Sequence, residues 1–207
     1  NYKHYVYILY ILIKIMKLLI TGAAGFIGYH LSRNLLEGGH EILGIDNLNN
    51  YYSPSLKKDR INILQDYQNF NFNKVDICNK RLLKKSFESF NPEKVINMAA
   101  QPGVRYSLEN PYAYMNSNLV GFINIIELSK RNKVEGFIYA SSSSVYGNSG
   151  KIPFNLNDSA DKPLSLYGAT KRSNELIAYS YSNLYELKTT GLRFFTVYGP
   201  WYRPDMS

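Results

Sequence analysis

Short apolar runs alternate with longer stretches of helical periodicity over most of the chain. Six runs have the length and composition of buried strands: Lys17–Ile20, Glu41–Ile45, Phe70–Val75, Lys94–Met98, Gly136–Ala140 and Thr189–Phe195. Five longer stretches between them favour helices: Gly25–Leu36, Ser53–Tyr67, Arg81–Phe90, Asn110–Lys130 and Ser165–Leu184. At the start of the second helix, Ser53 is expected to act as the cap and Pro54 to take the first helical position. Since each pair of parallel strands needs a crossover, the alternation predicts an α/β fold, a doubly wound, Rossmann-like parallel sheet.

Composition narrows the possible partners. The 207 residues, 45% of them hydrophobic, are enough for one core and too few for two ordinary domains. Twenty-four basic residues against 16 acidic ones leave a net charge of +8, but no run of Lys and Arg exceeds two residues. This spread is typical of a solvated surface or of a site for an anionic small molecule, so we predict no nucleic-acid partner.

Cysteine and histidine are scarce. Cys78 is the single cysteine, which excludes an intrachain disulfide and favours a reducing, cytoplasmic setting. His4, His30 and His40 are too scattered for a metal site, and we predict that no metal is bound.

Both ends of the chain are unusual. Residues 5–15 are apolar and rich in tyrosine, but they amount to only about half a membrane span and lack a small-residue cleavage site. We therefore expect no membrane anchor, a natural start at Met16, and residues 1–15 to be non-native or, alternatively, an extension of the first strand. Residues 203–207 have no tail-like composition, which suggests that a domain spanning residues 16–207 is truncated before a further lobe.

A glycine-rich turn follows the first strand and opens the first helix. In the sequence TGAAGFIG, Gly22 permits a tight turn, Gly25 lets the backbone approach a pyrophosphate, and Gly28 lets the helix pack closely on the strand. Asp46 lies 18 residues after Gly28, at the end of the second strand, where its carboxylate can accept from ribose hydroxyls. The pattern predicts a dinucleotide site. NAD is favoured over NADP, because no Arg directly follows Asp46 and its charge would repel a 2′-phosphate.

Two further strand ends carry candidate ligand contacts. Asp76 and Ile77 follow the third strand, and residues 99–101 follow the fourth, at the sheet edge where open α/β sheets bind ligands. Asp76 could accept from the adenine amine, or it could simply cap the next helix.

A tyrosine and a lysine share one face of the last helix. Tyr167 and Lys171 stand at i and i+4, and an ammonium beside a phenol is expected to lower its pKa toward neutrality, which would make Tyr167 a usable general base. Ser142 ends the fifth strand within the run Ser141–Ser144, where a hydroxyl could share a hydrogen bond with Tyr167 and a substrate oxygen; the alternative is a Ser-rich turn.

Together, the TGxxGFIG turn, the Ser-containing strand end and the YxxxK helix resemble the extended short-chain dehydrogenase/reductases, the NAD-dependent epimerase/dehydratase family, over residues 17–207. The resemblance implies that Ser142, Tyr167 and Lys171 are catalytic and that Asn118, the family's helix asparagine, lies on the substrate side. It also implies that family members commonly form homodimers. The positions that match its NAD contacts are Gly22, Gly25, Phe26, Ile27, Gly28, Asp46, Asn47, Asp76, Ile77, Ala99, Ala100, Gln101, Ala140, Tyr167, Lys171 and Phe194.

Three segments are similar to the UDP-glucuronate 4-epimerases in particular: residues 46–52, 101–107 and 193–206. In that family, the positions of Thr196 and Arg203 face the sugar carboxylate, which an arginine fork can bind through two parallel bonds. Arg105 is a second candidate for a carboxylate or phosphate, unless it is a plain surface arginine. Tyr202 departs from the family, which has a small residue there.

The implied reaction is NAD-dependent inversion at C4 of a UDP-sugar, from UDP-glucuronate to UDP-galacturonate through a 4-keto sugar. Ser143 and Ser144 stand where related dehydratases and decarboxylases carry carboxylates, which argues against both activities. Two alternatives stay open: a UDP-glucose/UDP-galactose 4-epimerase, and a catalytically silent NAD-binding fragment.

Overall fold

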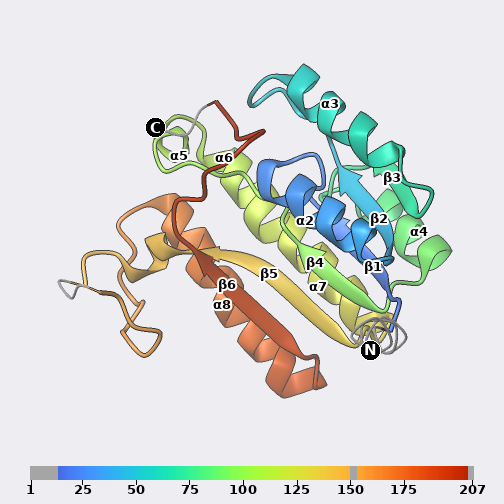
Figure 1. Ribbon diagram of the computed structural model, residues 1–207. Helices are drawn as coiled ribbons and strands as arrows, with labels where there is room; N and C mark the ends of the chain where they lie inside the picture. The colour runs from blue at the N-terminus through green and yellow to red at the C-terminus, as the bar shows by residue number, and fades with distance from the viewer. Residues whose placement is uncertain (1–13, 150–152, 205–207) are drawn as a thin grey trace, which may run out of the picture.

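Six strands of the described residues form one parallel sheet in the order β3-β2-β1-β4-β5-β6. The computed structural model describes residues 14–149 and 153–204, so the expectations for residues 1–13 and for the last three residues lie outside it. The strands are β1 Lys17–Thr21, β2 Glu41–Asp46, β3 Phe70–Lys74, β4 Lys94–Asn97, β5 Gly136–Ser142 and β6 Thr189–Phe194. The expected doubly wound sheet is confirmed (Figure 1).

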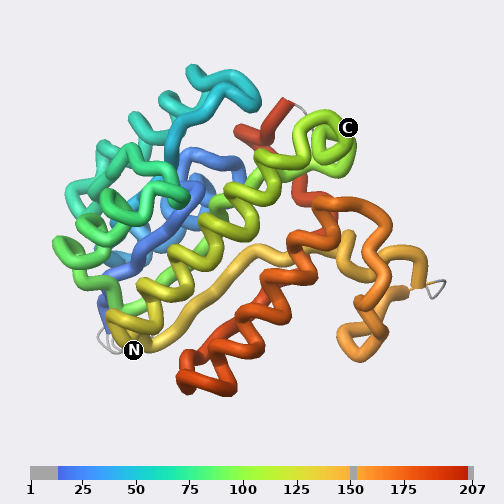
Figure 2. Tube along the Cα trace, turned by 180° about the vertical axis from the view of Figure 1, so that it is seen from behind, coloured from blue at the N-terminus to red at the C-terminus, as the bar shows by residue number. Residues whose placement is uncertain are grey.

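Helices cover both faces of this sheet. The helices of one face are α2 Phe26–Glu37 and α3 Pro54–Gln65, and those of the other are α4 Lys80–Phe90, α7 Phe122–Arg131 and α8 Leu166–Tyr185. From behind, α7 and α8 lie side by side across the sheet (Figure 2). Strand alternation separates two cores, since Leu18 and Ile20 of β1 pack toward α2 while Leu19 packs toward α4 and α7. Each such buried side chain contributes about 1.5–3 kcal/mol to folding.

The helix expected from residue 110 to residue 130 is present but is not uniform. It consists of α6 Pro111–Tyr114, a π-helical segment η1 Met115–Gly121, and α7. Gly121 lies so close to Ile77 that a Cβ there would be 2.4 Å from Ile77 Cδ1. Apolar periodicity cannot reveal a π-helical insertion, and it also missed two single-turn elements, α5 Tyr106–Glu109 and the 3₁₀ helix η2 Ser143–Tyr146.

The caps correct one expectation. Pro54 does take the first position of α3, but the Ser53 hydroxyl hydrogen-bonds Ser55 Oγ at 2.7 Å instead of capping the helix. Ser165 caps α8 by accepting from Gly168 N at 3.0 Å.

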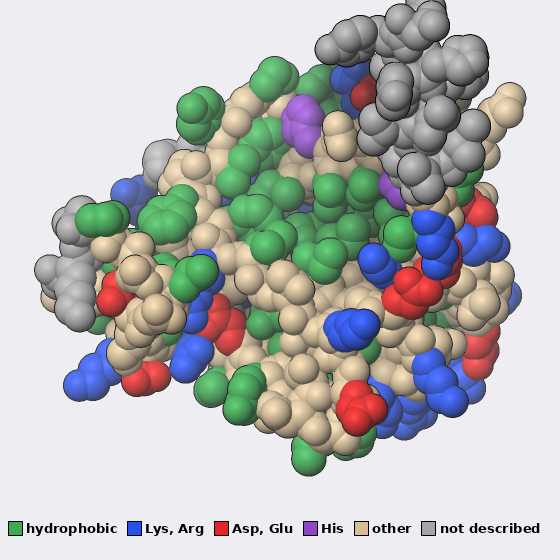
Figure 3. Space-filling model, turned by 60° about the horizontal axis from the view of Figure 1, so that its bottom comes forward, with side chains coloured by type: hydrophobic (Ala, Val, Ile, Leu, Met, Phe, Trp, Pro, Cys, Tyr) green, Lys and Arg blue, Asp and Glu red, His purple; other side chains and the backbone are tan. Residues whose placement is uncertain are grey.

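Surface charge is mixed. On the face shown in Figure 3, Lys and Arg side chains lie among acidic ones, around a central area of apolar side chains. Among the described residues, no helix is both long enough and apolar enough to cross a membrane.

Candidate active site

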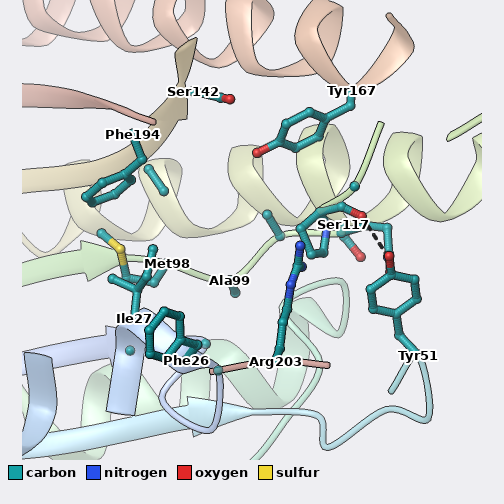
Figure 4. A pocket seen from close by; sticks show the side chains of 18 of the residues that line it. Phe26, Ile27, Tyr51, Met98, Ala99, Ser117, Ser142, Tyr167, Phe194 and Arg203 are labelled. Carbon is teal, nitrogen blue, oxygen red and sulfur yellow. Dashed lines mark hydrogen bonds between the residues drawn. The ribbon is translucent and has the colours of Figure 1, made fainter. Parts of the chain in front are cut away.

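A cavity of about 400 Å³ opens at the carboxyl ends of the strands. Its walls come from the glycine-rich turn, from the loops after β2, β3 and β4, and from the segments around Ser142, Tyr167 and Phe194 (Figure 4). Of the residues singled out in the sequence, the following line it: Gly22, Gly25, Phe26, Ile27, Gly28, Asp46, Asn47, Asp76, Ile77, Ala99, Ala100, Gln101, Ala140, Ser142, Tyr167, Lys171, Phe194, Thr196 and Arg203. Folding therefore brings segments 180 residues apart to one site.

Two glycines of the turn leave no room for a side chain. Gly22 has φ +70°, and a Cβ there would lie 2.7 Å from the Ala99 amide nitrogen. At Gly28, a Cβ would lie 2.0 Å from the Gly22 carbonyl oxygen. The sequence predicted that Gly28 lets the helix pack closely on the strand; in the structure, the missing side chain lets α2 pack closely on the turn that follows the strand. The amides of residues 22–25 donate to Ile45 O, Asp46 Oδ2 and Gly22 O. The groups suited to an anionic phosphate are therefore the first amides of α2, which lack intrahelical partners.

Asp46 braces the turn from the next strand. Its Oδ2 accepts from Ala24 N at 3.2 Å and its Oδ1 accepts from Leu48 N at 2.8 Å. Burial raises the pKa of Asp46, and the cations of Lys57 and Arg60 on α3 oppose that rise.

Asp76 does not cap the following helix, because Asn79 does so by accepting from Leu82 N at 3.1 Å. Instead, Asp76 accepts from Asn47 Nδ2 and from Cys78 N, both at 2.8 Å. Burial alone would raise the pKa of Asp76, but these hydrogen bonds outweigh it and lower the pKa. The carboxylate thus joins the loops after β2 and β3 at the cavity wall.

The three candidate catalytic side chains meet at one end of the cavity. Ser142 lies at the end of β5, while Tyr167 and Lys171 come from the first turns of α8. Lys171 Nζ donates to Ala140 O at 2.9 Å and lies 5.9 Å from the centroid of the Tyr167 ring. The Ser142 hydroxyl accepts from Ser144 N at 3.2 Å and begins η2, so the Ser-rich turn and the candidate catalytic serine are the same feature.

The expectation that Lys171 depresses the pKa of Tyr167 is wrong for this structure. Burial raises the pKa of Tyr167, and the groups that oppose the rise are the Ser142 hydroxyl and the Arg203 guanidinium. The sequence spacing placed Lys171 on the correct face, but its ammonium is directed to the backbone of β5.

Burial lowers the pKa of Lys171 from 10.5 to about 8. Below pH 8, Lys171 is charged in both the folded and the unfolded chain, so the folded state bears the full cost of burying the ammonium. Between pH 8 and 10.5 the folded state releases the proton first, and the cost declines. The wild-type chain should therefore gain stability over this window.

We expect Lys171→Met to raise the free energy of unfolding at pH 7 by on the order of 2 kcal/mol, despite the lost bond to Ala140. The gain should shrink toward pH 10 in chemical denaturation. Lys58→Met, on the exposed surface of α3, is the control and should be neutral. A destabilised Lys171→Met chain whose deficit does not change with pH would contradict the burial cost.

Two predicted substrate contacts do not line the cavity. Asn118 is 1% exposed, and its amide accepts from Gln101 N at 2.7 Å and donates to Gln101 O and to Thr170 Oγ1. These bonds join the loop after β4 to α8, and they hold the Asn118 amide behind the cavity wall. Arg105 is exposed at the start of α5, in accord with the plain surface alternative.

Two residues of the wall, Lys57 and Ser117, belong to none of the motifs found in the sequence. Lys57 is 5% exposed and donates to Asn49 O and Oδ1 at 2.8 and 2.6 Å, while Ser117 reaches the cavity from the π-helical segment. Tyr51, Tyr52 and Gly103 also line the cavity, and they lie in the segments 46–52 and 101–107 whose similarity to the UDP-glucuronate 4-epimerases was found in the sequence.

The described residues contain no group of three or more His, Cys, Asp or Glu side chains placed to hold a metal ion. The Cys78 thiol donates to Asn116 O at 3.2 Å, and burial raises its pKa to about 12. At neutral pH this thiol is therefore a poor nucleophile.

The chain is similar in sequence to a family of NAD-dependent enzymes and to several known proteins. The model of the NAD dependent epimerase/dehydratase family matches residues 18–207. Protein CapI of Staphylococcus aureus is 58% identical over 192 residues, which cover 93% of this chain and 57% of CapI. A probable UDP-glucuronate 4-epimerase of Rhizobium meliloti is 49% identical, over 93% of this chain and 56% of that protein. The chain thus spans little more than half the length of these relatives.

Solved structures match as well. The UDP-glucuronic acid 4-epimerase of Bacillus cereus, in complex with UDP-glucuronic acid and NAD, superposes with a TM-score of 0.83 and 38% identity, over 92% of this chain and 60% of that chain. A UDP-glucose 4-epimerase of Thermotoga maritima, with UDP-glucose, gives a TM-score of 0.80 and 32% identity, over 89% and 57%.

Proposed function

Because the chain belongs to the NAD-dependent epimerase/dehydratase family, we propose that it binds NAD and carries the residues that invert C4 of UDP-glucuronate to give UDP-galacturonate. The observation that carries this proposal is the cavity itself: Tyr167 and Arg203 reach it from opposite sides, next to a glycine-rich turn shaped for a pyrophosphate (Figure 4).

The residues present fit a dinucleotide. The turn after β1 has no space for side chains at Gly22 and Gly28, and it leads into α2, whose first amides lack intrahelical partners and suit a pyrophosphate. Asp46 would accept from the adenosine ribose, and Asp76 would lie near the adenine. When bound, NAD supplies a reversible acceptor for the hydride of C4.

The proton chemistry falls to the chain's own side chains. Tyr167 would remove the proton of the 4-hydroxyl and return it after the sugar has turned over, and Ser142 would hydrogen-bond the same oxygen. Burial raises the pKa of Tyr167, and its hydrogen bond with the Ser142 hydroxyl opposes that rise, so Ser142 favours the ionised phenol that accepts the proton.

Arg203 is the feature that favours a uronate over a neutral hexose. Its guanidinium extends from the C-terminal segment into the cavity, toward Ser117 (Figure 4), and Thr196 lines the same cavity. A guanidinium can bind a carboxylate through two charge-assisted hydrogen bonds, which a CH₂OH group cannot match. The higher identity to the UDP-glucuronic acid 4-epimerase of Bacillus cereus (38%) than to the UDP-glucose 4-epimerase of Thermotoga maritima (32%) agrees with this choice.

Arg203→Gln tests the assignment. Loss of charged hydrogen bonds should raise the KM for UDP-glucuronate by about 10- to 100-fold, with little change for UDP-glucose, as measured by initial rates on both sugars. The matched control is Arg105→Gln, which removes an exposed arginine outside the cavity and should leave both KM values unchanged. An equal rise for both sugars would refute a carboxylate contact.

One alternative substrate is supported by a specific observation, the match to a UDP-glucose 4-epimerase at a TM-score of 0.80. Under this alternative, UDP-glucose would be converted by the wild-type protein at least as well as UDP-glucuronate, and Arg203→Gln would not discriminate between them.

A further inference from the structure

A fully buried arginine joins three segments at the rim of the cavity. Arg60, on α3, is 0% exposed. Its Nη1 donates to Ala24 O at 2.8 Å and to Tyr52 Oη at 2.7 Å, and its Nη2 donates to Trp201 O. No salt bridge to this guanidinium is present among the described residues, although the Asp46 carboxylate interacts with it electrostatically, and Nε has no hydrogen-bond partner. Burying a cation in this way is costly, so its three contacts need a structural or functional reason.

One of these contacts is to the segment that presents Arg203. Residues 199–204 cross the outside of α2, where His30 Nε2 donates to Pro200 O at 2.8 Å and Trp201 packs on Tyr29 with ring centroids 5.9 Å apart. Trp201 adopts φ +61°, a left-handed conformation that is unfavourable for a bulky residue unless its surroundings impose it. The bond from Arg60 to Trp201 O is one such constraint, two residues before Arg203.

A second contact is to the dinucleotide turn. The peptide groups on both sides of Ala24 are held, since its N–H donates to Asp46 Oδ2 and its carbonyl accepts from Arg60. Asp46, Ala24, Arg60 and Trp201 therefore form one connected chain from the cofactor side of the cavity to the substrate side.

We propose that Arg60 is a positioning residue that ties segment 199–204 to the dinucleotide turn and so orients Arg203 into the cavity. The inference rests on the proposed function only for the role of Arg203. The hydrogen bonds by which Arg60 connects segment 199–204 to the dinucleotide turn do not depend on any substrate. A planar guanidinium is suited to this task because its donors diverge to separate acceptors, whereas a lysine ammonium is a single point charge.

The test uses Trp201, which is the single tryptophan of the chain and lies at the tie. Acrylamide quenching of its fluorescence is compared in the wild type, Arg60→Met, Arg60→Lys and the control Lys58→Met, an exposed lysine on the same helix. We expect the quenching constant to rise at least about twofold in Arg60→Met and to a smaller extent in Arg60→Lys, because the lost bond releases the segment. Lys58→Met should match the wild type.

A wild-type quenching constant in folded Arg60→Met, or an equal rise in Lys58→Met, would overturn the proposal. If Arg60→Met does not fold, the result for Arg60→Lys is used instead. A quenching constant of Arg60→Lys equal to that of the wild type would show that Arg60 does not hold segment 199–204. The orientation of Arg203 is tested by kinetics, where Arg60→Lys should raise the KM for UDP-glucuronate by about tenfold with kcat within about twofold. A fall in kcat alone would overturn a positioning role. Should no variant or wild type turn over the sugar, the proposed function fails, while the quenching result still decides the tie.

Discussion

Replacing Tyr167 by phenylalanine should lower kcat for UDP-glucuronate by about 10³-fold or more, within the range that a positioned acid/base contributes. The change removes one oxygen and keeps the ring, which lies 6.2 Å from the Tyr114 ring and is held by α8. The fold and the affinity for NAD should therefore persist. Chromatography of the nucleotide sugars gives kcat, and calorimetry gives the affinity for NAD.

The control is Tyr179→Phe, on the same helix, whose side chain is 70% exposed and outside the cavity. It should have wild-type activity. A Tyr167→Phe protein that keeps more than about a tenth of the wild-type kcat would show that another group carries the proton, contrary to the role proposed here.

Gly28→Ala should abolish measurable NAD binding, or prevent folding, although it adds a single methyl group. The new Cβ would lie 2.0 Å from the Gly22 carbonyl oxygen and 2.8 Å from the Gly22 carbonyl carbon. Both contacts are to backbone, so no flexible side chain can yield, and either α2 or the turn must move. Overpacking typically costs about 1–3 kcal/mol, and more where backbone atoms clash; about 3 kcal/mol corresponds to a loss of NAD affinity of about 100-fold.

Gly136→Ala is the matched control, because a Cβ at this position of β5 would find its nearest neighbour at an ordinary 3.8 Å. Gly136→Ala should have an NAD affinity, measured by calorimetric titration, and a melting temperature close to those of the wild type. Unchanged NAD affinity in Gly28→Ala would mean that the cofactor does not use the turn after β1.

The architecture was predictable because each strand and helix repeats a local rule. Alternating apolar runs and amphipathic stretches determined all six strands and the main helices to within a few residues, and the glycine turn appeared where the first strand ends. Ser142, Tyr167 and Lys171 were predicted to share a site from the i, i+4 spacing of the tyrosine and the lysine, the serine at the end of the fifth strand, and the resemblance to the extended short-chain dehydrogenase/reductases.

The predictions that the structure does not support concern the direction in which side chains point, and the spacing of residues along the sequence does not determine that direction. Tyr167 and Lys171 share a helix face as expected, yet Lys171 bonds to Ala140 O and burial dominates the pKa of the tyrosine. Asn118 was placed on the correct helix, but the π-helical turn directs its amide to Gln101 and Thr170 rather than into the cavity. Such outcomes depend on contacts between residues far apart in sequence.

The role inferred for Arg60 could not be predicted from the sequence either. In the sequence Arg60 is one cation among 24, on a helix that also carries Lys57, Lys58 and Asp59. Only the packing of α3 against the turn after β1 and against segment 199–204 makes it a fully buried connector. Residues that work through backbone carbonyls have no motif of their own, so the structure is needed to find them.

The most direct test of the central claim is to incubate the purified protein with NAD and, separately, with UDP-glucuronate or UDP-glucose, and to resolve the products by anion-exchange chromatography. The account predicts that UDP-galacturonate forms from UDP-glucuronate and that UDP-glucose is converted far more slowly. Interconversion of UDP-glucose and UDP-galactose with UDP-glucuronate left unchanged would contradict it, as would a protein that binds NAD and converts neither sugar.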